Sequence, residues 1–112
     1  MIRKKNTYFD SEKEHRHSDG WNKAYTSWFY AEDDCNIEVR ELLYEREIHD
    51  FVEALRKAGM KSFVITDHRT NLIEQLHAFV EEGCTLNGVC TLYKNSSFCT
   101  KYKVNGIRID LN

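Results

Sequence analysis

The sequence predicts a two-layer α+β protein, in which about three helices pack on one side of a small mixed β-sheet. Three segments carry apolar residues at the three- and four-residue spacing of amphipathic helices. Other segments are β-branched or alternate between polar and apolar positions, as strands do. In chain order the expected elements are α-α-β-α-β-β-β. The 112 residues suffice for one domain, because separate cores need roughly 100 residues each.

Composition and charge indicate a soluble globular protein. Hydrophobic residues make up 41% and charged residues 30%. The net charge of -2 implies no global affinity for nucleic acid or an anionic membrane. With no apolar run near the roughly 20 residues of a spanning helix and no signal-peptide h-region, we expect a cytoplasmic protein without membrane contact. The four cysteines, Cys35, Cys84, Cys90 and Cys99, are then expected to be reduced thiols.

The N-terminal half predicts a flexible arm followed by the domain. Residues 1–17 are mostly charged, and only Tyr8 and Phe9 add apolar weight, so we expect a loosely attached arm and a domain over 18–112. Ser18 or Asp19 then caps a helix that ends near Asp33 and Asp34, where acids meet the negative end of the helix dipole. Its apolar stripe contains Trp21, Ala24, Tyr25, Trp28 and Phe29, either as core anchors or with a part left exposed to bind a partner.

The middle of the chain predicts a helix, a strand and a further helix. Residues 37–44 fit either a strand or the start of a helix. The next helix covers about residues 45–58 and stops at Gly59, which supplies a left-handed terminator. Residues 61–66 are a short buried strand, and residues 72–82 form the third helix. A strand over 84–93 would complete a βαβ unit with a right-handed crossover.

The C-terminal segment contains two Asn-Gly pairs. Asn105-Gly106 lies between KYKV and IRIDL and predicts a two-residue type I′ hairpin turn. Asn87-Gly88 lies within good strand sequence, so a bulge is the preferred interpretation there. Residues 95–97 are expected to form a loop.

The stretch FVITDHRTNLIEQ, residues 63–75, is the first place to look for catalysis. It has Asp67 beside His68 after a strand, but no nucleophile elbow or Gly-rich phosphate loop accompanies them. A capping arrangement with Asn71 and Glu74 explains the polar residues more simply. We therefore expect no catalytic residue and no enzyme activity.

The histidines and cysteines have spacings that do not favour a metal centre. His15 and His17 lie on the expected arm, and Cys84 and Cys90 are separated by five residues, unlike the close pairs of zinc sites. Cys84 and Cys90 are interpreted as core thiols. We expect neither a metal nor a cofactor.

Two surfaces are candidates for binding. An acidic face could engage a basic protein groove; it comprises Glu32, Asp33, Asp34, Glu38, Glu41, Glu45 and Glu47. A C-terminal hairpin interleaves aromatics with cations, which suits contacts with phosphates and bases; it comprises Tyr93, Lys94, Lys101, Tyr102, Lys103 and Arg108. Alternatively, these lysines only protect strand edges from pairing.

Residues 44–93, YEREIHDFVEALRKAGMKSFVITDHRTNLIEQLHAFVEEGCTLNGVCTLY, resemble a family of small proteins from clostridial bacteria, their phages and mobile elements, known as a domain of unknown function. The passage LRKAG to SFVIT and the motif F.E.GC.L.G carry the resemblance, which covers roughly residues 21–93. The family provides no catalytic residues to transfer. Its setting implies phage or plasmid functions, including inhibitors of bacterial immune nucleases.

We therefore expect a non-enzymatic protein-binding factor of a phage or mobile element, such as an anti-CRISPR-like inhibitor of a bacterial defence nuclease complex. The expected partner is a host protein or ribonucleoprotein complex, bound by a monomer or homodimer. The alternative is a nucleic-acid-binding accessory protein that uses the C-terminal hairpin.

Overall fold

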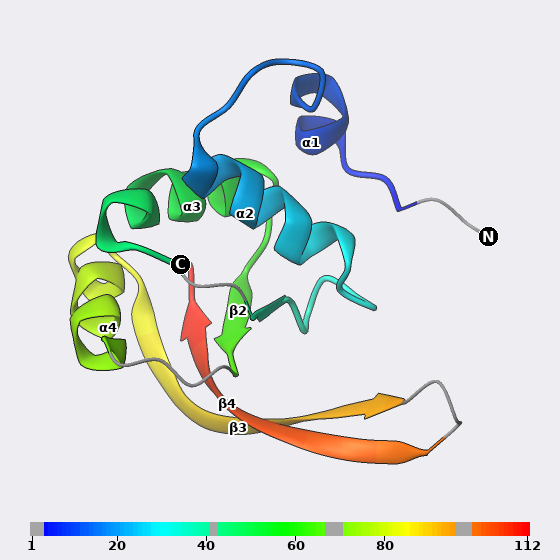
Figure 1. Cartoon of the computed structure of the whole chain (residues 1–112), viewed down its shortest axis with the longest axis vertical. Coiled ribbons are helices and arrows are strands. Elements are labelled where there is room, and N and C mark those ends of the chain that lie inside the picture. Colours follow the sequence, from blue (N-terminus) through cyan, green and yellow to red (C-terminus); the bar gives the residue numbers. More distant parts are fainter. Residues whose placement is uncertain (1–3, 41–42, 67–70, 96–99) are drawn as a thin grey trace.

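The computed structural model describes residues 4–40, 43–66, 71–95 and 100–112 and confirms the α+β class. The helices pack against one mixed sheet, from which a long two-stranded ribbon extends (Figure 1). In chain order the elements are α1 (Thr7–Glu12), α2 (Asp19–Phe29), β1 (Glu38–Val39), α3 (Glu45–Lys57), β2 (Ser62–Ile65), α4 (Leu72–Glu81), β3 (Thr85–Asn95) and β4 (Lys101–Asp110).

The sheet has the strand order β1-β2-β4-β3. β1 runs parallel to β2, whereas β4 is antiparallel to both of its neighbours. The expected crossover from β2 through α4 to β3 therefore skips one position, because β4 returns and inserts between the two strands. The parallel neighbours are β1 and β2, joined by α3, and β1 resolves the ambiguity of residues 37–44 in favour of a short strand.

The helix α2 begins at a capping residue that the sequence predicts. The Ser18 hydroxyl accepts a hydrogen bond from the Trp21 amide at 3.4 Å, and Trp21 and Trp28 are both buried, which confirms them as core anchors. The end predicted near Asp33 is wrong, because α2 stops at Phe29. α3 ends as predicted before Gly59, whose φ of 85° is the left-handed conformation of a helix terminator.

The helix α4 forms where it was expected, but the predicted cap is absent. Asn71 occupies the N-cap position, yet its side chain makes no capping hydrogen bond. Instead its Oδ1 accepts a hydrogen bond from Gln75 Nε2 at 3.3 Å, and the buried Gln75 side chain also donates to the Leu43 carbonyl. Gln75 therefore competes for the oxygen that capping would require. The neighbouring residues 67–70, including Asp67 and His68, lie outside the described residues.

The two Asn-Gly pairs behave differently from one another. Asn87-Gly88 forms the expected bulge, since the β3–β4 register shifts between Leu86 and Gly88, and Gly88 has a φ of 128°. The predicted turn at Asn105-Gly106 is wrong, because both residues lie within the continuous strand β4. Gly106 is required there for close packing: a Cβ atom would come within 2.6 Å of Val64 Cγ1 and 2.7 Å of the Ile65 carbonyl oxygen.

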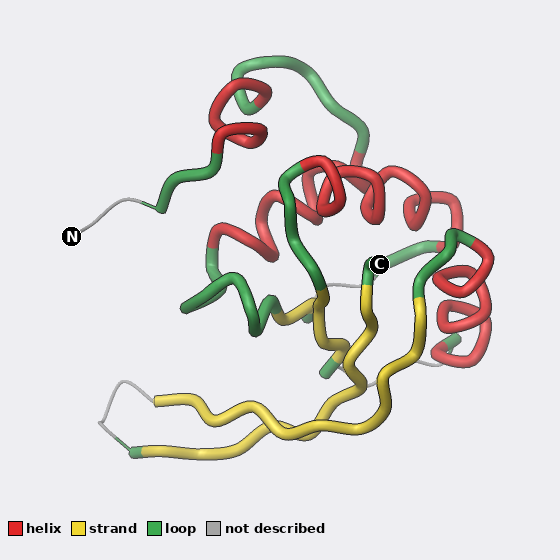
Figure 2. Tube along the Cα trace, turned by 180° about the vertical axis from the view of Figure 1, so that it is seen from behind, coloured by secondary structure: helices red, strands yellow, loops and turns green. Residues whose placement is uncertain are grey.

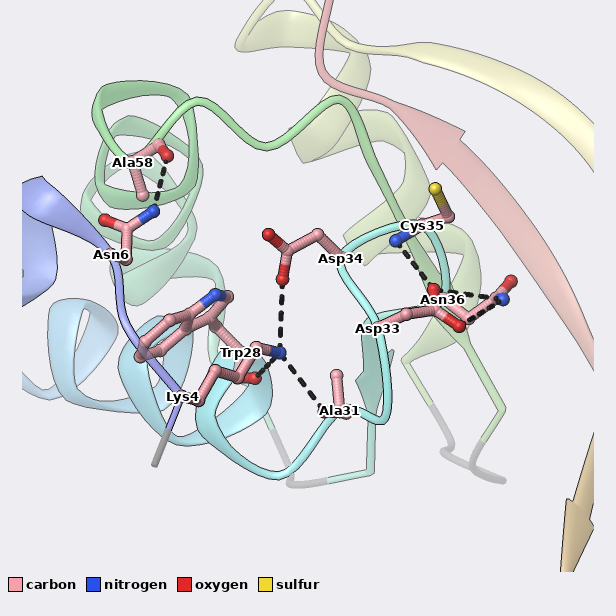
Figure 3. A network of polar contacts seen from close by, with 9 residues as sticks. All are labelled: Lys4, Asn6, Trp28, Ala31, Asp33, Asp34, Cys35, Asn36 and Ala58. Atoms are coloured by element: carbon pink, nitrogen blue, oxygen red, sulfur yellow. Dashed lines mark hydrogen bonds and ion pairs between the residues drawn. The ribbon is translucent and has the colours of Figure 1, made fainter. Parts of the chain in front are cut away.

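Residues 4–17, the described part of the expected arm, pack against the helices and are not loosely attached. Its helix α1 places Phe9 in the core with no exposed surface, 4.9 Å from the Trp28 ring and 5.6 Å from the Trp21 ring. Asn6 Nδ2 donates to the Ala58 carbonyl at the end of α3 at 2.9 Å (Figure 3). The sequence did not predict this packing, because Phe9 is one apolar residue within a mostly charged segment.

Candidate protein-binding cleft

A cleft of about 560 Å³ lies between the end of α2, the loop that follows it and the far part of the β3–β4 ribbon. We define the ribbon as residues 90–95 and 101–106, which pair with each other beyond the last β2–β4 pair, Ile65 with Ile107. The ribbon curves beneath the loop that leads from α2 to β1 (Figures 1 and 2). The cleft therefore lies where these two segments face each other.

The cleft brings together the two surfaces that sequence analysis treated as alternatives. Glu32, Asp33 and Glu38 of the predicted acidic face line it from one side. Tyr93, Lys94 and Tyr102 of the predicted basic hairpin line it from the other. β1 and β3 lie at opposite edges of the sheet. The two surfaces nevertheless face each other, because the ribbon curls back under the loop between α2 and β1 (Figure 1).

Exposed tyrosines form much of the accessible wall. The residues Tyr30, Tyr93 and Tyr102 are 72%, 77% and 46% exposed, although large aromatic side chains are usually covered. Tyrosine combines a broad apolar ring with a hydroxyl group, so it binds partner surfaces at low entropic cost. Tyr30 lies outside the aromatic stripe that the sequence predicted, and within that stripe Phe29 is the aromatic residue that stays exposed, by 38%.

The floor of the cleft is an ion-pair network centred on Glu38. Its carboxylate pairs with Lys94, accepts a hydrogen bond from Thr66 Oγ1, and lies 4.0 Å from Arg40 Nε. Burial acts to raise the pKa of Glu38, but the hydrogen bonds from Lys94 and Thr66 and the positive charges outweigh it and hold the pKa below its ordinary value. The ionised Glu38 thus fastens the ribbon to the body of the sheet.

The loop between α2 and β1 is shaped by its own acids. Asp33 Oδ1 accepts hydrogen bonds from the Cys35 amide at 2.8 Å and from Asn36 Nδ2 at 3.3 Å (Figure 3). Asp34 pairs with Lys4 Nζ at 3.2 Å, and the same ammonium group donates to the Trp28 and Ala31 carbonyls. Glu32 is exposed at the rim of the cleft. Two of these acids therefore hold the loop, and Glu32 faces solvent.

Glu47 does not belong to an exposed acidic face, which corrects the sequence-based assignment. Its side chain is 6% exposed and accepts hydrogen bonds from Lys23 Nζ at 2.8 and 3.1 Å and from the Tyr44 amide at 2.8 Å. Burial acts to raise the pKa of Glu47, but these hydrogen bonds and the Lys23 charge lower it overall. Glu45 is exposed away from the cleft, and Glu41 lies outside the described residues.

The predicted basic hairpin is also divided by the fold. Arg108 donates to the Cys35 carbonyl at 2.8 Å, to Asn36 Oδ1 at 2.9 Å and to Ser62 Oγ at 3.0 Å, so it ties the loop to the sheet. Lys94 is engaged with Glu38. The side chains of Lys101 and Lys103 remain exposed on the ribbon. The cations of the predicted hairpin therefore do not form one contiguous strip of unpaired charges, because Arg108 and Lys94 are engaged in contacts within the protein.

His17 and Cys84 contribute to packing, whereas Cys35 is exposed. The His17 ring stacks on Trp21 at 3.7 Å, and burial raises the pKa of the Cys84 thiol, whose Sγ lies 3.8 Å from Arg56 Nη2. Cys84 is buried as predicted, whereas Cys90 is only partly buried. In residues 4–40, 43–66, 71–95 and 100–112, no cluster of three or more His, Cys, Asp or Glu side chains is arranged to hold a metal. None of the helices over these residues is long and apolar enough to cross a membrane.

The fold and cleft define an α+β protein with a curled β-ribbon that encloses a tyrosine-lined surface site. The chain belongs to the family described as a domain of unknown function (DUF7698), whose model matches residues 21–111. This match extends beyond the resemblance noted over roughly 21–93 and takes in the whole ribbon. No curated protein and no solved structure shows significant similarity to the chain.

Proposed function

We propose that the chain is a non-enzymatic protein-binding factor whose partner docks on the cleft between the α2–β1 loop and the ribbon. One observation carries this proposal: Tyr30, Tyr93 and Tyr102 expose large ring surfaces around a preformed cleft. Aromatic residues that anchor a binding surface supply most of its energy. The ion pairs beneath them keep the walls in place, so little ordering would be required when a partner binds.

The charge at the rim favours a partner with basic side chains. Glu32 lies at the mouth of the cleft beside Tyr30, and tyrosine rings attract ammonium and guanidinium groups. The two cations that line the cleft, Lys94 and Arg40, are paired with Glu38. We extend the proposal to an anti-CRISPR-like inhibitor of a bacterial defence nuclease complex, on the strength of the resemblance to phage and mobile-element proteins.

The test is recovery of the tagged chain from a lysate of its native host, with and without nuclease treatment. We expect a stoichiometric protein partner that survives the nuclease. The double variant Tyr30→Ala/Tyr93→Ala should lose this partner, because both side chains are exposed and their removal leaves the core intact. The matched control is Glu45→Lys, a charge reversal in the same acidic run but outside the cleft, which should retain the partner.

The result that would contradict the proposal is equal recovery of the partner by the double variant and by the wild type. Inhibition of a defence nuclease is tested separately, by adding the purified chain to the reconstituted complex and measuring DNA cleavage. Unchanged cleavage in the presence of a bound partner would remove the inhibitor assignment but leave the binding assignment standing.

The nucleic-acid alternative is favoured by a single observation. Lys101 and Lys103 are exposed and pair across the ribbon with Asn95 and Tyr93. If this surface binds nucleic acid, the retained material should be released by nuclease, and affinity should fall with salt and on changing Lys101 and Lys103 to Glu. Salt-independent retention of protein would exclude this alternative in favour of the cleft.

A further inference from the structure

The strand β3 forms one edge of the sheet and offers its backbone to a further strand. It is the last strand in the order β1-β2-β4-β3 and spans 11 residues, longer than most strands. Val89 is 89% exposed and Leu86 is 43% exposed along it. An edge strand presents a row of amide and carbonyl groups without strand partners, which is a template for pairing with another chain.

The sequence of this edge carries little of the usual protection against pairing. Residues 85–93, TLNGVCTLY, contain no charged residue, and the chain contains no proline. Lys94 follows, but its ammonium group is engaged with Glu38. The lysines that were considered as edge guards, Lys101 and Lys103, lie on β4, whose residues 101–106 form the other open edge of the ribbon, and not on β3. The bulge at Leu86–Gly88 limits pairing at one end and leaves residues 89–95 in regular register.

We propose that β3 pairs antiparallel with β3 of a second copy of this chain, about a two-fold axis at Thr91. This register places Val89 of each copy directly opposite Tyr93 of the other, because paired residues lie symmetrically about the axis. Both side chains point to the same face as Thr91 and are largely exposed in the single chain, Val89 by 89% and Tyr93 by 77%. Pairs of an aromatic and a β-branched residue across strands are among the stabilising ones.

Charge favours a second copy as the occupant of the edge. Since residues 85–93 are uncharged, pairing with an identical strand brings no like charges into register. In this register Lys94 of each copy lies opposite Gly88 of the other, so the charged residue that follows the uncharged run also meets no like charge. This inference shares Tyr93 with the proposed cleft, so a second copy on this edge and a partner in the cleft would compete for that side chain. It rests on the open backbone edge of β3 and not on the proposed function.

Sedimentation equilibrium of the full chain tests the proposal. We expect a reversible, concentration-dependent dimer. Val89→Glu should raise the dimer dissociation constant by roughly tenfold or more, because two charges would replace two apolar pairs. The matched control is Ile73→Glu, which puts the same charge on another exposed apolar residue, 64% exposed on α4, and should leave the dissociation constant unchanged.

A crosslink tests the register independently of the stability of the variants. The background for this test is a chain with Cys35, Cys90 and Cys99 changed to Ser. In it, Thr91→Cys should form an intermolecular disulfide under mild oxidation, because the Cα atoms of two residues that lie opposite each other on the axis are close enough for a disulfide. Asn95→Cys in the same background should not, since its two copies would be several strand positions apart. A wild-type chain that is monomeric up to its solubility limit, a Val89→Glu dimer of unchanged affinity, or equal crosslinking of both cysteine variants would each overturn the proposal.

Discussion

Two carboxylates that are two positions apart have opposite roles in α3. Glu45 is exposed, whereas Glu47 is buried, because helical residues two apart point about 200° away from each other around the axis. Glu47 acts as the N3 residue of a capping arrangement with the Tyr44 amide and also pairs with Lys23 of α2. One side chain thus closes the start of α3 and joins two helices.

The substitution Glu47→Ala should destabilise the protein by about 2 kcal/mol, because it removes the acceptor of the Tyr44 amide and the ion pair with Lys23. Glu45→Ala is the control, and we expect a change within about 0.5 kcal/mol, as for exposed positions in general. Urea unfolding monitored by circular dichroism measures both. Equal midpoints for the two variants would show that the buried carboxylate contributes no net stability.

At the scale of elements, α3 and α4 are joined by a histidine that bridges two acids. His49 Nδ1 lies 2.6 Å from Glu82 Oε1 and its Nε2 lies 3.2 Å from Glu53 Oε2. The hydrogen bond and charge of Glu82, with smaller help from Glu53, raise the pKa of His49 above its ordinary value of 6.5. The contact is fully formed when the ring is protonated.

The contribution of His49 to stability should be present below its unfolded-state pKa near 6.5 and disappear as the pH rises through the higher folded-state pKa. An NMR titration of the His49 ring protons measures the shift directly. Glu82→Gln should move the pKa of His49 back toward 6.5, whereas Glu74→Gln, on the same helix but without a contact to His49, should not. Similar titrations in both variants would contradict the assigned bridge.

The tight approach of β4 to β2 depends on Gly106. A Cβ atom at this position would meet Val64 Cγ1 at 2.6 Å and the Ile65 carbonyl oxygen at 2.7 Å, and the backbone oxygen cannot rotate away. Gly106→Ala should therefore destabilise the protein by about 1–3 kcal/mol through overpacking. Asn105→Ala, at the exposed neighbouring position, is the control for strand propensity. Thermal unfolding of the pair measures the difference, and equal melting temperatures would mean that the strands separate at no cost.

At the scale of the whole molecule, the N-terminal segment completes the core of the helical layer. Phe9 contacts the rings of Trp21, Tyr25 and Trp28, although α1 lies before the family match at residues 21–111. Lys4 and Asn6 satisfy carbonyl groups at the ends of α2 and α3. The segment therefore covers an aromatic face of the region that the family model matches.

Phe9→Ala should cost about 3–5 kcal/mol, because it removes a fully buried aromatic ring and leaves a cavity against both tryptophans. The exposed Lys5→Ala is the control and should be close to neutral. Guanidinium unfolding followed by tryptophan fluorescence measures stability and the loss of the apolar surroundings of Trp21 and Trp28 together. A native emission spectrum with unchanged stability in Phe9→Ala would show that α1 is not part of the cooperative core.

The elements that sequence patterns predicted well are those with strong local signals. The stripe that ends at Gly59, the β-branched run at 62–65 and the bulge at Asn87-Gly88 each depend on residues close together in the chain. The turn prediction at Asn105-Gly106 failed because a turn there competes with the continuous pairing of β4 with β3, in which Asn105 lies opposite Thr91 and Gly106 opposite Cys90. The sequence did not predict that α1 packs on the domain, because this packing depends on one residue, Phe9, and on aromatic side chains of a different helix, α2.

The sequence by itself determined the α+β class, the main helices and strands and the uncharged run of β3, because periodicity, capping and turn preferences act over a few residues. Only the tertiary structure decided which charges face solvent. Glu38 and Lys94 are 56 positions apart, and Arg108 reaches a carbonyl 73 positions away, so their pairing depends on strand order and on the curl of the ribbon. The same long-range packing turned an acidic segment and a basic hairpin into two walls of one cleft, because the contacts that join distant segments have no signature in local sequence.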